Sequence, residues 1–302
     1  MKVAAIGIGS NSLRMLVAEI EAGALRQPVR FRKGLRVFAA LDSAGNISQE
    51  MIRLGCESVL EFKNQALDAG AQKIHLFATS AVRDAANQAE FAERLFGATG
   101  LELDVCSGNE EASLSFWGAT GQGATGLIDI GGGSTEIAVG NNGSIHDAVS
   151  LQLGAVRLFR EIPISNTDEA EKVVCKASGI ISTVGERFYD NGGSYSWVGV
   201  GGTFTTCAAV VQRIPWQQRD RIHHFEMMQK NVEEAIAFLA PMSTDERLAL
   251  ECLQPQRADI VVHGLAILWA CMRELNIHSI TVSEHGNLEG YLKSKYVFKT
   301  FN

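Results

Sequence analysis

The chain has 302 residues, a length that exceeds the usual size of one compact core and therefore predicts two domains. Hydrophobic residues make up 46% and charged residues 20% of the sequence, as is typical of a globular protein. The formal net charge of −7 argues against a general nucleic-acid binder and against adsorption to an acidic membrane, although it is compatible with a local anion site.

A short strand-and-turn motif occurs twice in the chain. The residues Ile6-Gly7-Ile8-Gly9 near the N-terminus align with Ile128-Asp129-Ile130-Gly131 at an offset of 122 positions. In each copy an apolar strand enters a turn of glycine and serine and a second strand follows, which predicts a β-hairpin. Two copies of the hairpin predict two similar domains facing each other, and the alternative is a chance likeness between two glycine-rich hairpins.

Helices and strands alternate after the first hairpin. The stretch 45–70 places its apolar residues on one helical stripe, with Ser48 as the expected N-cap and Gly70 as the expected C-cap. The following segments predict, in chain order, a strand at 73–80, a helix at 81–97, a strand at 101–107 and a helix at 110–119.

The second half repeats this alternation beyond its own hairpin. The expected elements are a helix at 167–190, a strand at 195–202, helices at 203–212, 229–240, 243–252 and 257–275, a strand at 279–283 and a short closing helix from Leu288. Such alternation predicts α/β layers with mixed sheets.

The stretch 26–36 holds five basic residues and no acidic one. If it is a strand, Arg30, Arg32 and Arg36 could line a path for a polyanion. The alternative is a solvated edge strand that is protected from aggregation by its charges.

The six cysteines, at positions 56, 106, 175, 207, 252 and 271, form no C-x-x-C motif and no cluster with histidine. We therefore expect buried thiols in a reducing compartment rather than zinc ligands or disulfides. The N-terminus lacks the apolar core of a signal peptide, and the apolar run 259–272 is too short to cross a bilayer. These features predict a cytoplasmic protein with no membrane and no nucleic-acid partner.

Small residues in a turn let backbone N–H groups converge on an anion without obstruction by Cβ atoms. The two hairpin turns are therefore candidate phosphate sites, formed by Gly9, Ser10, Asn11 and Ser12 in the first copy and by Gly131, Gly132, Gly133, Ser134 and Thr135 in the second. Asp129, at the end of its strand, is placed to hold a Mg²⁺ ion that bridges phosphates.

The segment around Gly201, Gly202 and Thr203 combines a strand end, two glycines and a helix N-terminus. This combination is typical of an anion or nucleotide cradle, although it also serves simply to close a domain. The histidine pairs 223/224 and 263/285 show no metal-ligand spacing, which favours surface or core roles.

Several motifs together carry a family resemblance. They are GSNSLR (9–14), ATSAVRDAAN (78–87), SGNEEA (107–112), LIDIGGGSTEI (127–137), LGAVRL (153–158), GVGGTFTTCAAV (199–210) and RAD (257–259). In this order they resemble the exopolyphosphatase/guanosine pentaphosphate phosphatase family of the actin–sugar kinase–Hsp70 superfamily, in its short two-domain form.

The resemblance implies an α/β fold of two ribonuclease-H-like domains, as in actin-like ATPases, with mixed sheets flanking a central cleft. The first domain would comprise residues 1–120 and about 287–302, and the second residues 121–286. The implied activity is Mg²⁺-dependent release of terminal phosphate from inorganic polyphosphate or guanosine pentaphosphate. Family members of this size also make a homodimer plausible.

The resemblance assigns the catalytic residues as well. Glu110 and Glu111 open one helix, where successive side chains point about 100° apart, so only one of them can face the substrate. The family pattern gives the water-activating role to Glu111, and the alternative is that both acids complement the helix dipole. Arg83 matches a phosphate-binding position, although a lone arginine there is also compatible with a solvated surface residue.

Arg157 matches another family position, where a structural ion pair is an equal alternative. Glu136 is a candidate for a supporting role behind the site.

Two positions depart from the family pattern. Gly7 stands where the first turn normally has an aspartate, and Leu288 stands where a basic residue is usual. The loss of the carboxylate is expected to weaken metal binding, and Gly7→Asp would then restore it. Three functions remain open: a Mg²⁺-dependent phosphohydrolase, a non-catalytic sensor of polyphosphate or a guanosine alarmone, and a nucleotide-dependent kinase, of which the motifs disfavour the kinase.

Overall fold

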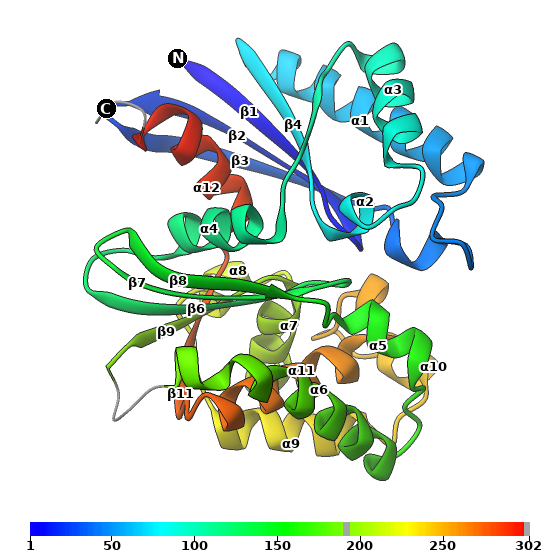
Figure 1. The fold of residues 1–302 in the computed structure, drawn as a ribbon, viewed down its shortest axis with the longest axis vertical. Helices are drawn as coiled ribbons and strands as arrows, with labels where there is room; N and C mark the ends of the chain where they lie inside the picture. The colour runs from blue at the N-terminus through cyan, green and yellow to red at the C-terminus, as the bar shows by residue number, and fades with distance from the viewer. Residues whose placement is uncertain (190–193, 299–302) are drawn as a thin grey trace. The chain divides into compact units, whose positions relative to one another are not determined.

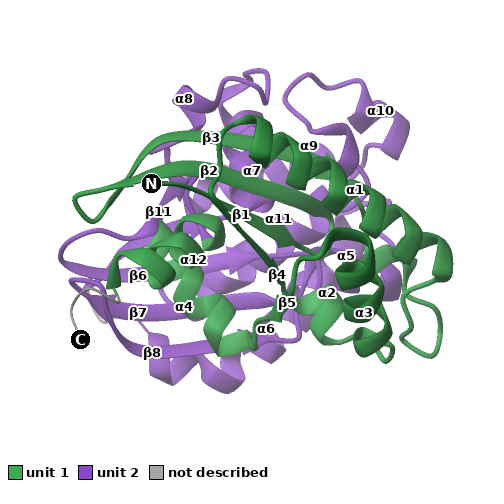
Figure 2. Cartoon of the chain, turned by 90° about the horizontal axis from the view of Figure 1, so that it is seen from above, with its two compact units in different colours: residues 1–118, 287–302 green, residues 119–286 purple. Residues whose placement is uncertain are grey.

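The computed structural model describes residues 1–189 and 194–298, and its chain divides into two compact units (Figure 1, Figure 2). Unit 1 comprises residues 1–118 and 287–302, and unit 2 comprises residues 119–286. The first limit lies two residues before the expected position 120. The chain thus passes between the units twice.

Unit 1 is built on a five-stranded sheet with the strand order β3-β2-β1-β4-β5. The strands are β1 (Lys2–Ile8), β2 (Ser12–Glu21), β3 (Ala24–Gly34), β4 (Lys73–Ala78) and β5 (Leu103–Val105). The β1–β2 and β2–β3 pairs are antiparallel, whereas the β1–β4 and β4–β5 pairs are parallel. This mixed order is that of a ribonuclease-H-like sheet, as expected.

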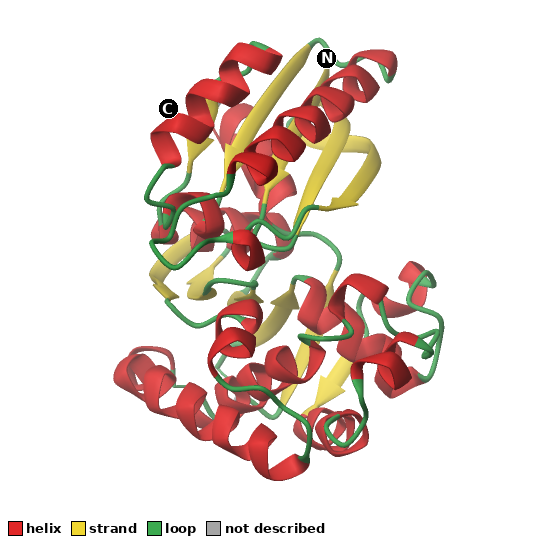
Figure 3. Cartoon of the chain, turned by 90° about the vertical axis from the view of Figure 1, so that its right-hand side faces the viewer, coloured by secondary structure: helices red, strands yellow, loops and turns green. Residues whose placement is uncertain are grey.

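The helices of unit 1 pack as two groups. The helices are α1 (Gln49–Asp68), α2 (Ser80–Arg83), α3 (Gln88–Thr99), α4 (Gly108–Ala119) and α12 (Asn287–Tyr296), and a short 3-10 helix covers Phe38–Ala40. Helix α1 packs on α3 and also contacts β1 and β2, whereas α12 packs on β1, β2 and β3. Figure 3 shows the strands with helices beside them. Alternate residues of the strands, such as Val3 and Leu16, form a buried cluster with Leu292 of α12.

One helix predicted in unit 1 begins where it was expected, and another is divided into two. Helix α1 begins as expected, because the Ser48 hydroxyl accepts a hydrogen bond from the Met51 N–H at 3.2 Å. The single helix expected at 81–97 is wrong, since the chain forms α2 and α3 with a break between them. At the break the Asn87 side chain bonds both the N–H and the C=O of Ile47 instead of continuing a helix.

The basic stretch is an edge strand, since β3 pairs only with β2 among the described strands. Its residues 26–30 are exposed, and Arg30 forms an ion pair with Glu289 of α12 at 2.6 Å. The charged edge strand is therefore confirmed. The polyanion path remains a prediction, and Arg36 lies beyond the strand end.

Unit 2 contains a six-stranded mixed sheet with the order β10-β11-β9-β6-β7-β8. The strands are β6 (Ala124–Ile130), β7 (Thr135–Asn141), β8 (Ser144–Leu151), β9 (Ser196–Val200), β10 (Glu226–Met228) and β11 (Ser279–Ser283). The β6–β7 and β7–β8 pairs are antiparallel, and the β6–β9 and β9–β11 pairs are parallel. Five strands thus repeat the order and directions found in unit 1, so the predicted duplication is confirmed.

The described helices of unit 2 include the nearly fully buried α11. They are α5 (Ala155–Glu161), α6 (Thr167–Phe188), α7 (Gly202–Gln212), α8 (Arg219–Ile222), α9 (Gln229–Leu239), α10 (Thr244–Leu248) and α11 (Val261–Glu274), with a 3-10 turn at Pro255–Arg257. Helix α11 packs on α5, α6, α7 and α9. The apolar run 259–272 therefore builds the core of unit 2.

Several predictions in unit 2 were incomplete. Strand β8 and helix α5 were not predicted, and the helices expected at 243–252 and 257–275 are shorter than expected. The predicted end of the helix 167–190 falls on Asp190, outside the described residues. Within residues 1–189 and 194–298, none of the helices combines the length and apolar composition needed to cross a bilayer.

The cysteines follow the prediction only in part. All six are free, and Cys106, Cys207 and Cys271 are buried. Cys175 is exposed on α6, and Cys56 and Cys252 are only partly buried, so the expectation of six buried thiols is wrong at these three positions. Burial raises the pKa of the Cys106 thiol to about 12, which keeps that thiol protonated.

Candidate active site

The first turn joins β1 to β2 in unit 1. It is closed by a hydrogen bond of 3.1 Å from the Gly9 N–H to the Ser12 carbonyl. Ser10, Asn11 and Ser12 are each 6% exposed. The segment after β3 supports the turn from behind, because the Arg36 N–H donates to the Asn11 carbonyl at 3.2 Å. The turn is therefore a rigid group of small polar residues.

The second turn, between β6 and β7 of unit 2, has the same closure. The Gly131 N–H donates to the Ser134 carbonyl at 2.9 Å. Here the support is the N-terminus of α5, whose Ala155 and Val156 N–H groups donate to the carbonyls of Gly131 and Gly132. A Cβ atom at Gly154 would lie 2.3 Å from the Gly132 oxygen, so only glycine allows α5 to approach this turn.

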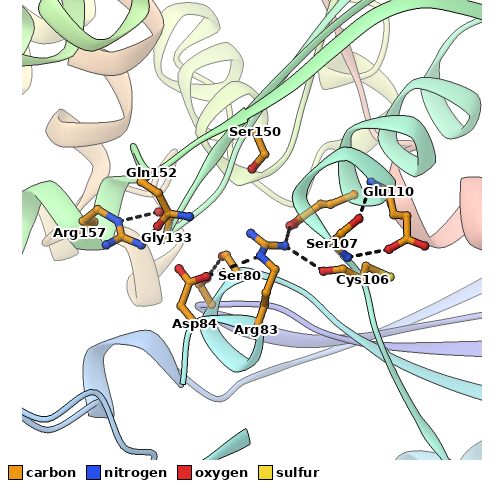
Figure 4. Close-up of polar contacts among 12 residues, drawn as sticks. Ser80, Arg83, Asp84, Cys106, Ser107, Glu110, Gly133, Ser150, Gln152 and Arg157 are labelled. Atoms are coloured by element: carbon orange, nitrogen blue, oxygen red, sulfur yellow. Dashed lines mark hydrogen bonds and ion pairs between the residues drawn. The ribbon is translucent and has the colours of Figure 1, made fainter. Parts of the chain in front are cut away.

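Side chains hold the second turn as well. Thr135, fully buried, donates its hydroxyl hydrogen to the Leu153 carbonyl at 2.6 Å. Arg157 donates from Nε to the Gly133 carbonyl at 2.8 Å and from its terminal nitrogen to Gln152 (Figure 4). In these bonds Arg157 braces the backbone of the turn.

Asp129 is the second-last residue of β6, the strand that leads into the second turn, and 9% of its surface is exposed. Across the β6–β7 pair it stands opposite Glu136, whose carboxylate accepts a hydrogen bond of 2.7 Å from Ser150. A Cβ atom on Gly201 would lie 2.8 Å from the Asp129 Oδ1 atom. Gly201 also has a φ of +91°, so glycine is required there for two reasons.

The residues around Asp129 suit a magnesium ion. Mg²⁺ in proteins is usually held by one or two carboxylates together with substrate phosphates and water, and Asp129 offers one such carboxylate beside the turn. Among the described residues no three His, Cys, Asp or Glu side chains are arranged as a complete metal site. The second carboxylate that the family pattern places in unit 1 is absent at Gly7.

The two glycines after β9, Gly201 and Gly202, are closely approached by other side chains. Gly202 begins α7, and a Cβ atom on it would lie 1.8 Å from the guanidinium carbon of Arg257. Arg257 therefore brings a cation directly onto the N-terminal end of α7. The hydroxyl of Thr203, the next residue of α7, lies 3.5 Å from the Ile130 carbonyl. The sequence pointed to the RAD motif but not to this position of its arginine.

In unit 1 the two adjacent glutamates diverge, as the helical geometry predicts. Glu110 is exposed and caps its own helix, since its carboxylate accepts the Ser107 N–H at 2.7 Å (Figure 4). Glu111 is 6% exposed and accepts a hydrogen bond of 2.9 Å from Arg83. Glu110 therefore caps the N-terminus of α4, whereas Glu111 is buried and paired with Arg83.

Arg83 ends the short helix α2 rather than beginning a long helix. Its terminal nitrogen also donates to the Cys106 carbonyl at 3.1 Å, and its Nε lies 3.6 Å from Asp84 (Figure 4). Ser80, at the start of α2, shares a hydrogen bond of 2.8 Å with Ser10 of the first turn. The helix α2 therefore links the first turn to the Arg83–Glu111 pair, a connection that sequence reasoning missed.

Histidines lie apart from these groups. His263 is buried in the core of unit 2, where its Nε2 lies 2.8 Å from the Ile162 carbonyl, and burial lowers its pKa. His223 stacks on His224 with ring centroids 3.8 Å apart and lies 4.8 Å from His285. The expected core role of His263 is confirmed, and the other three rings form a cluster that the sequence did not indicate.

The sequence profile of the Ppx/GppA phosphatase family matches residues 16–297. Exopolyphosphatase 2 of Mycobacterium tuberculosis is 31% identical over 314 aligned positions, which cover 96% of this chain and 97% of that protein. Exopolyphosphatase 1 of Mycobacterium bovis is 29% identical, and the alignment covers 88% of that protein.

Two solved structures share the fold. A Ppx/GppA family member from Aquifex aeolicus has a TM-score of 0.83 and 24% identity, with 100% of this chain and 99% of that chain covered. An exopolyphosphatase from Cytophaga hutchinsonii has a TM-score of 0.87 and 20% identity, with 98% of each chain covered.

Proposed function

Because the chain belongs to the Ppx/GppA phosphatase family, we propose that it hydrolyses the terminal phosphoanhydride bond of a phosphate chain. The observation that carries this proposal is the buried Glu111, held by Arg83 and joined through α2 to the first turn. The similarity to proteins named exopolyphosphatase supports inorganic polyphosphate as the substrate. Guanosine pentaphosphate is the second candidate, because it also ends in linked phosphates.

In the proposed reaction Glu111 accepts a proton from the attacking water. The water oxygen forms a bond to the terminal phosphorus, and the bridging P–O bond breaks, so that inorganic phosphate and a shortened chain are released. Arg83 holds the Glu111 carboxylate in place before the attack, and its planar guanidinium is suited to contact phosphate oxygens. Backbone N–H groups of the first turn, which lies in the same unit as Arg83 and Glu111, are the proposed donors to the negatively charged oxygens.

The proposed cofactor is Mg²⁺, held by Asp129. When bound, the ion neutralises charge on the phosphate oxygens as the bridging bond breaks. Glu136, opposite Asp129, adds negative charge that favours a cation at this position. Addition of a chelator is therefore expected to stop phosphate release.

The alternative is a sensor that binds the phosphate chain without cleaving it. The replacement of the usual aspartate by Gly7 favours this alternative, because it removes one expected metal ligand. A kinase is disfavoured by the phosphatase family profile. The homodimer and the cytoplasmic location expected from the sequence stay predictions.

Phosphate release from medium-chain polyphosphate in the presence of Mg²⁺ tests the proposal. We expect Glu111→Gln to lower the rate by roughly 10²–10⁴-fold, because it removes the base. Glu110→Gln is the matched control, since the amide oxygen of glutamine can still cap α4. A wild-type protein that binds polyphosphate but releases no phosphate would instead support the sensor.

A further inference from the structure

The position of Gly7 is crowded by a neighbouring ring. In the parallel pairing of β1 and β4, Gly7 lies beside Phe77. A Cβ atom on Gly7 would lie 2.8 Å from the Phe77 Cζ atom and 3.1 Å from one Cε atom. Because carbon atoms in proteins do not approach this closely, any side chain at position 7 must displace the ring.

The Phe77 ring is held firmly in place. Only 1% of Phe77 is exposed, and its ring stacks on Tyr291 of α12 with centroids 4.5 Å apart and an interplanar angle of 7°. The Tyr291 hydroxyl donates to Asp104 at 2.9 Å, which fixes the second ring. Displacement of Phe77 would therefore disturb two packed aromatic residues and the partly buried hydrogen bond from Tyr291 to Asp104.

The second departure from the family pattern lies in the same place. Leu288, where the family usually has a basic residue, belongs to the buried cluster that contains Phe77 and Tyr291. An isolated charge in such surroundings is strongly unfavourable unless it has a partner. Position 7 thus lacks the carboxylate of the family pattern and position 288 lacks its basic residue, while Leu288 lies in the apolar cluster that contains Phe77.

Unit 2 shows the contrasting arrangement. The parallel neighbour of Asp129 is Val200, a smaller side chain without a ring. The space beside the strand end can then be occupied by the Asp129 carboxylate, which Gly201 approaches closely. The neighbouring strand therefore decides whether this position can carry an acid.

We propose that Phe77, Leu288 and Tyr291 form an apolar plug at Gly7 that excludes a metal ligand from the first turn, so that divalent-metal binding in this chain depends on Asp129. The proposal rests on the proposed function only for the role of the metal in hydrolysis. It also revises the expectation for Gly7→Asp. That substitution places a carboxylate against Phe77 and Leu288, and it therefore destabilises unit 1 without creating a ligand.

Thermal unfolding tests the packing part of the proposal. We expect Gly7→Ala to lower Tm by roughly 2–10 °C, as overpacking of a core does in a domain of this size. In the Phe77→Val background the same substitution should cost little, because the ring is gone. Gly97→Ala is the matched control in unit 1, since a Cβ atom there meets nothing within 4 Å. An equal cost of Gly7→Ala in both backgrounds would overturn the plug.

Recovery of Tm by compensating substitutions tests the part of the proposal that concerns charge. Gly7→Asp alone should lower Tm more than Gly7→Ala, because it also buries an unpaired charge. Addition of Phe77→Val and Leu288→Arg to Gly7→Asp should recover most of this loss, by providing space and a partner. If Leu288→Arg worsens the loss in that background, positions 7 and 288 are not coupled and the proposal fails.

Binding of Mn²⁺ alone, followed by electron paramagnetic resonance, tests the metal part. We expect Asp129→Asn to weaken Mn²⁺ binding by at least about 10-fold, and Gly7→Asp to leave it unchanged. Tighter binding by Gly7→Asp, or no Mn²⁺ binding by the wild type, would overturn the proposal. None of these measurements uses hydrolysis, so a protein that passes them but releases no phosphate would contradict only the proposed function.

Discussion

The two turns share one backbone and differ in one side chain. Gly9 and Gly131 close them with the same N–H to C=O hydrogen bond, and both turns lie between antiparallel strands. Two residues before each of these glycines, unit 1 has Gly7 and unit 2 has Asp129. The two turns therefore share a backbone closure that small residues allow, whereas the position that precedes the turn carries an acidic side chain in unit 2 and none in unit 1.

The helices that follow the neighbouring strands differ too. In unit 1, Ser80 of α2 bonds the first turn, and the same helix carries Arg83 to Glu111. In unit 2, Gly202 of α7 has no side chain and Arg257 fills the space. The duplicated hairpins thus have different surroundings: a helix that carries the Arg83–Glu111 pair in unit 1, and in unit 2 a helix whose first glycine lies against the Arg257 guanidinium.

The largest expected effect concerns Gly201. Gly201→Ala introduces a Cβ atom 2.8 Å from the Asp129 carboxylate and also strains a φ of +91°, so we expect a loss of roughly 2–4 kcal/mol and weaker Mn²⁺ binding. Gly123→Ala is the matched control, because its φ of +89° carries the same strain in open space. Equal losses in chemical denaturation would show that Asp129 does not need this close approach.

An intermediate effect is expected for the link between the first turn and α2. Ser80→Ala removes the 2.8 Å hydrogen bond to Ser10 and leaves a buried hydroxyl without this partner, at a cost of about 1–2 kcal/mol. Because α2 also carries Arg83, phosphate release should fall as well. Ser113→Ala is the control, since that hydroxyl bonds only the Asn109 carbonyl of its own helix. A Ser80→Ala variant as active and as stable as this control would contradict the link.

The smallest expected effect is a pH dependence of folding stability that arises from a histidine in unit 2. Burial lowers the pKa of His263 in the core of unit 2, so the unfolded chain binds a proton more readily than the folded chain. Stability is therefore complete above the unfolded pKa of about 6.5 and falls as the pH decreases toward the folded pKa. Denaturation of wild type and His263→Gln at pH 7 and pH 5 checks this, and an equal loss on acidification in both would contradict it.

Much of the site could be predicted from the sequence, for identifiable reasons. The turns follow from small residues between apolar strands, and the separation of Glu110 from Glu111 follows from helical geometry. The Phe77 plug could not be predicted, because the pairing of Gly7 with Phe77 depends on strand register across 70 positions. Similarly, Arg257 reaches Gly202 only through the tertiary fold.

The errors in the secondary structure have a common cause. The break between α2 and α3 arises because Asn87 bonds the distant Ile47 backbone, which no local pattern reveals. Helix α5 is short, and its N-terminus is held by the carbonyls of the second turn. Both features depend on tertiary hydrogen bonds rather than on hydrophobic periodicity.

The central claim is that the metal ligand belongs to unit 2 and that the first turn has none. The most direct measurement is the Mg²⁺ dependence of phosphate release from polyphosphate by wild type, Asp129→Asn and Gly7→Ala/Phe77→Val. If Asp129 holds the metal, Asp129→Asn requires at least about 10-fold more Mg²⁺, whereas the double variant keeps the wild-type requirement. An unchanged Mg²⁺ requirement in Asp129→Asn would contradict it.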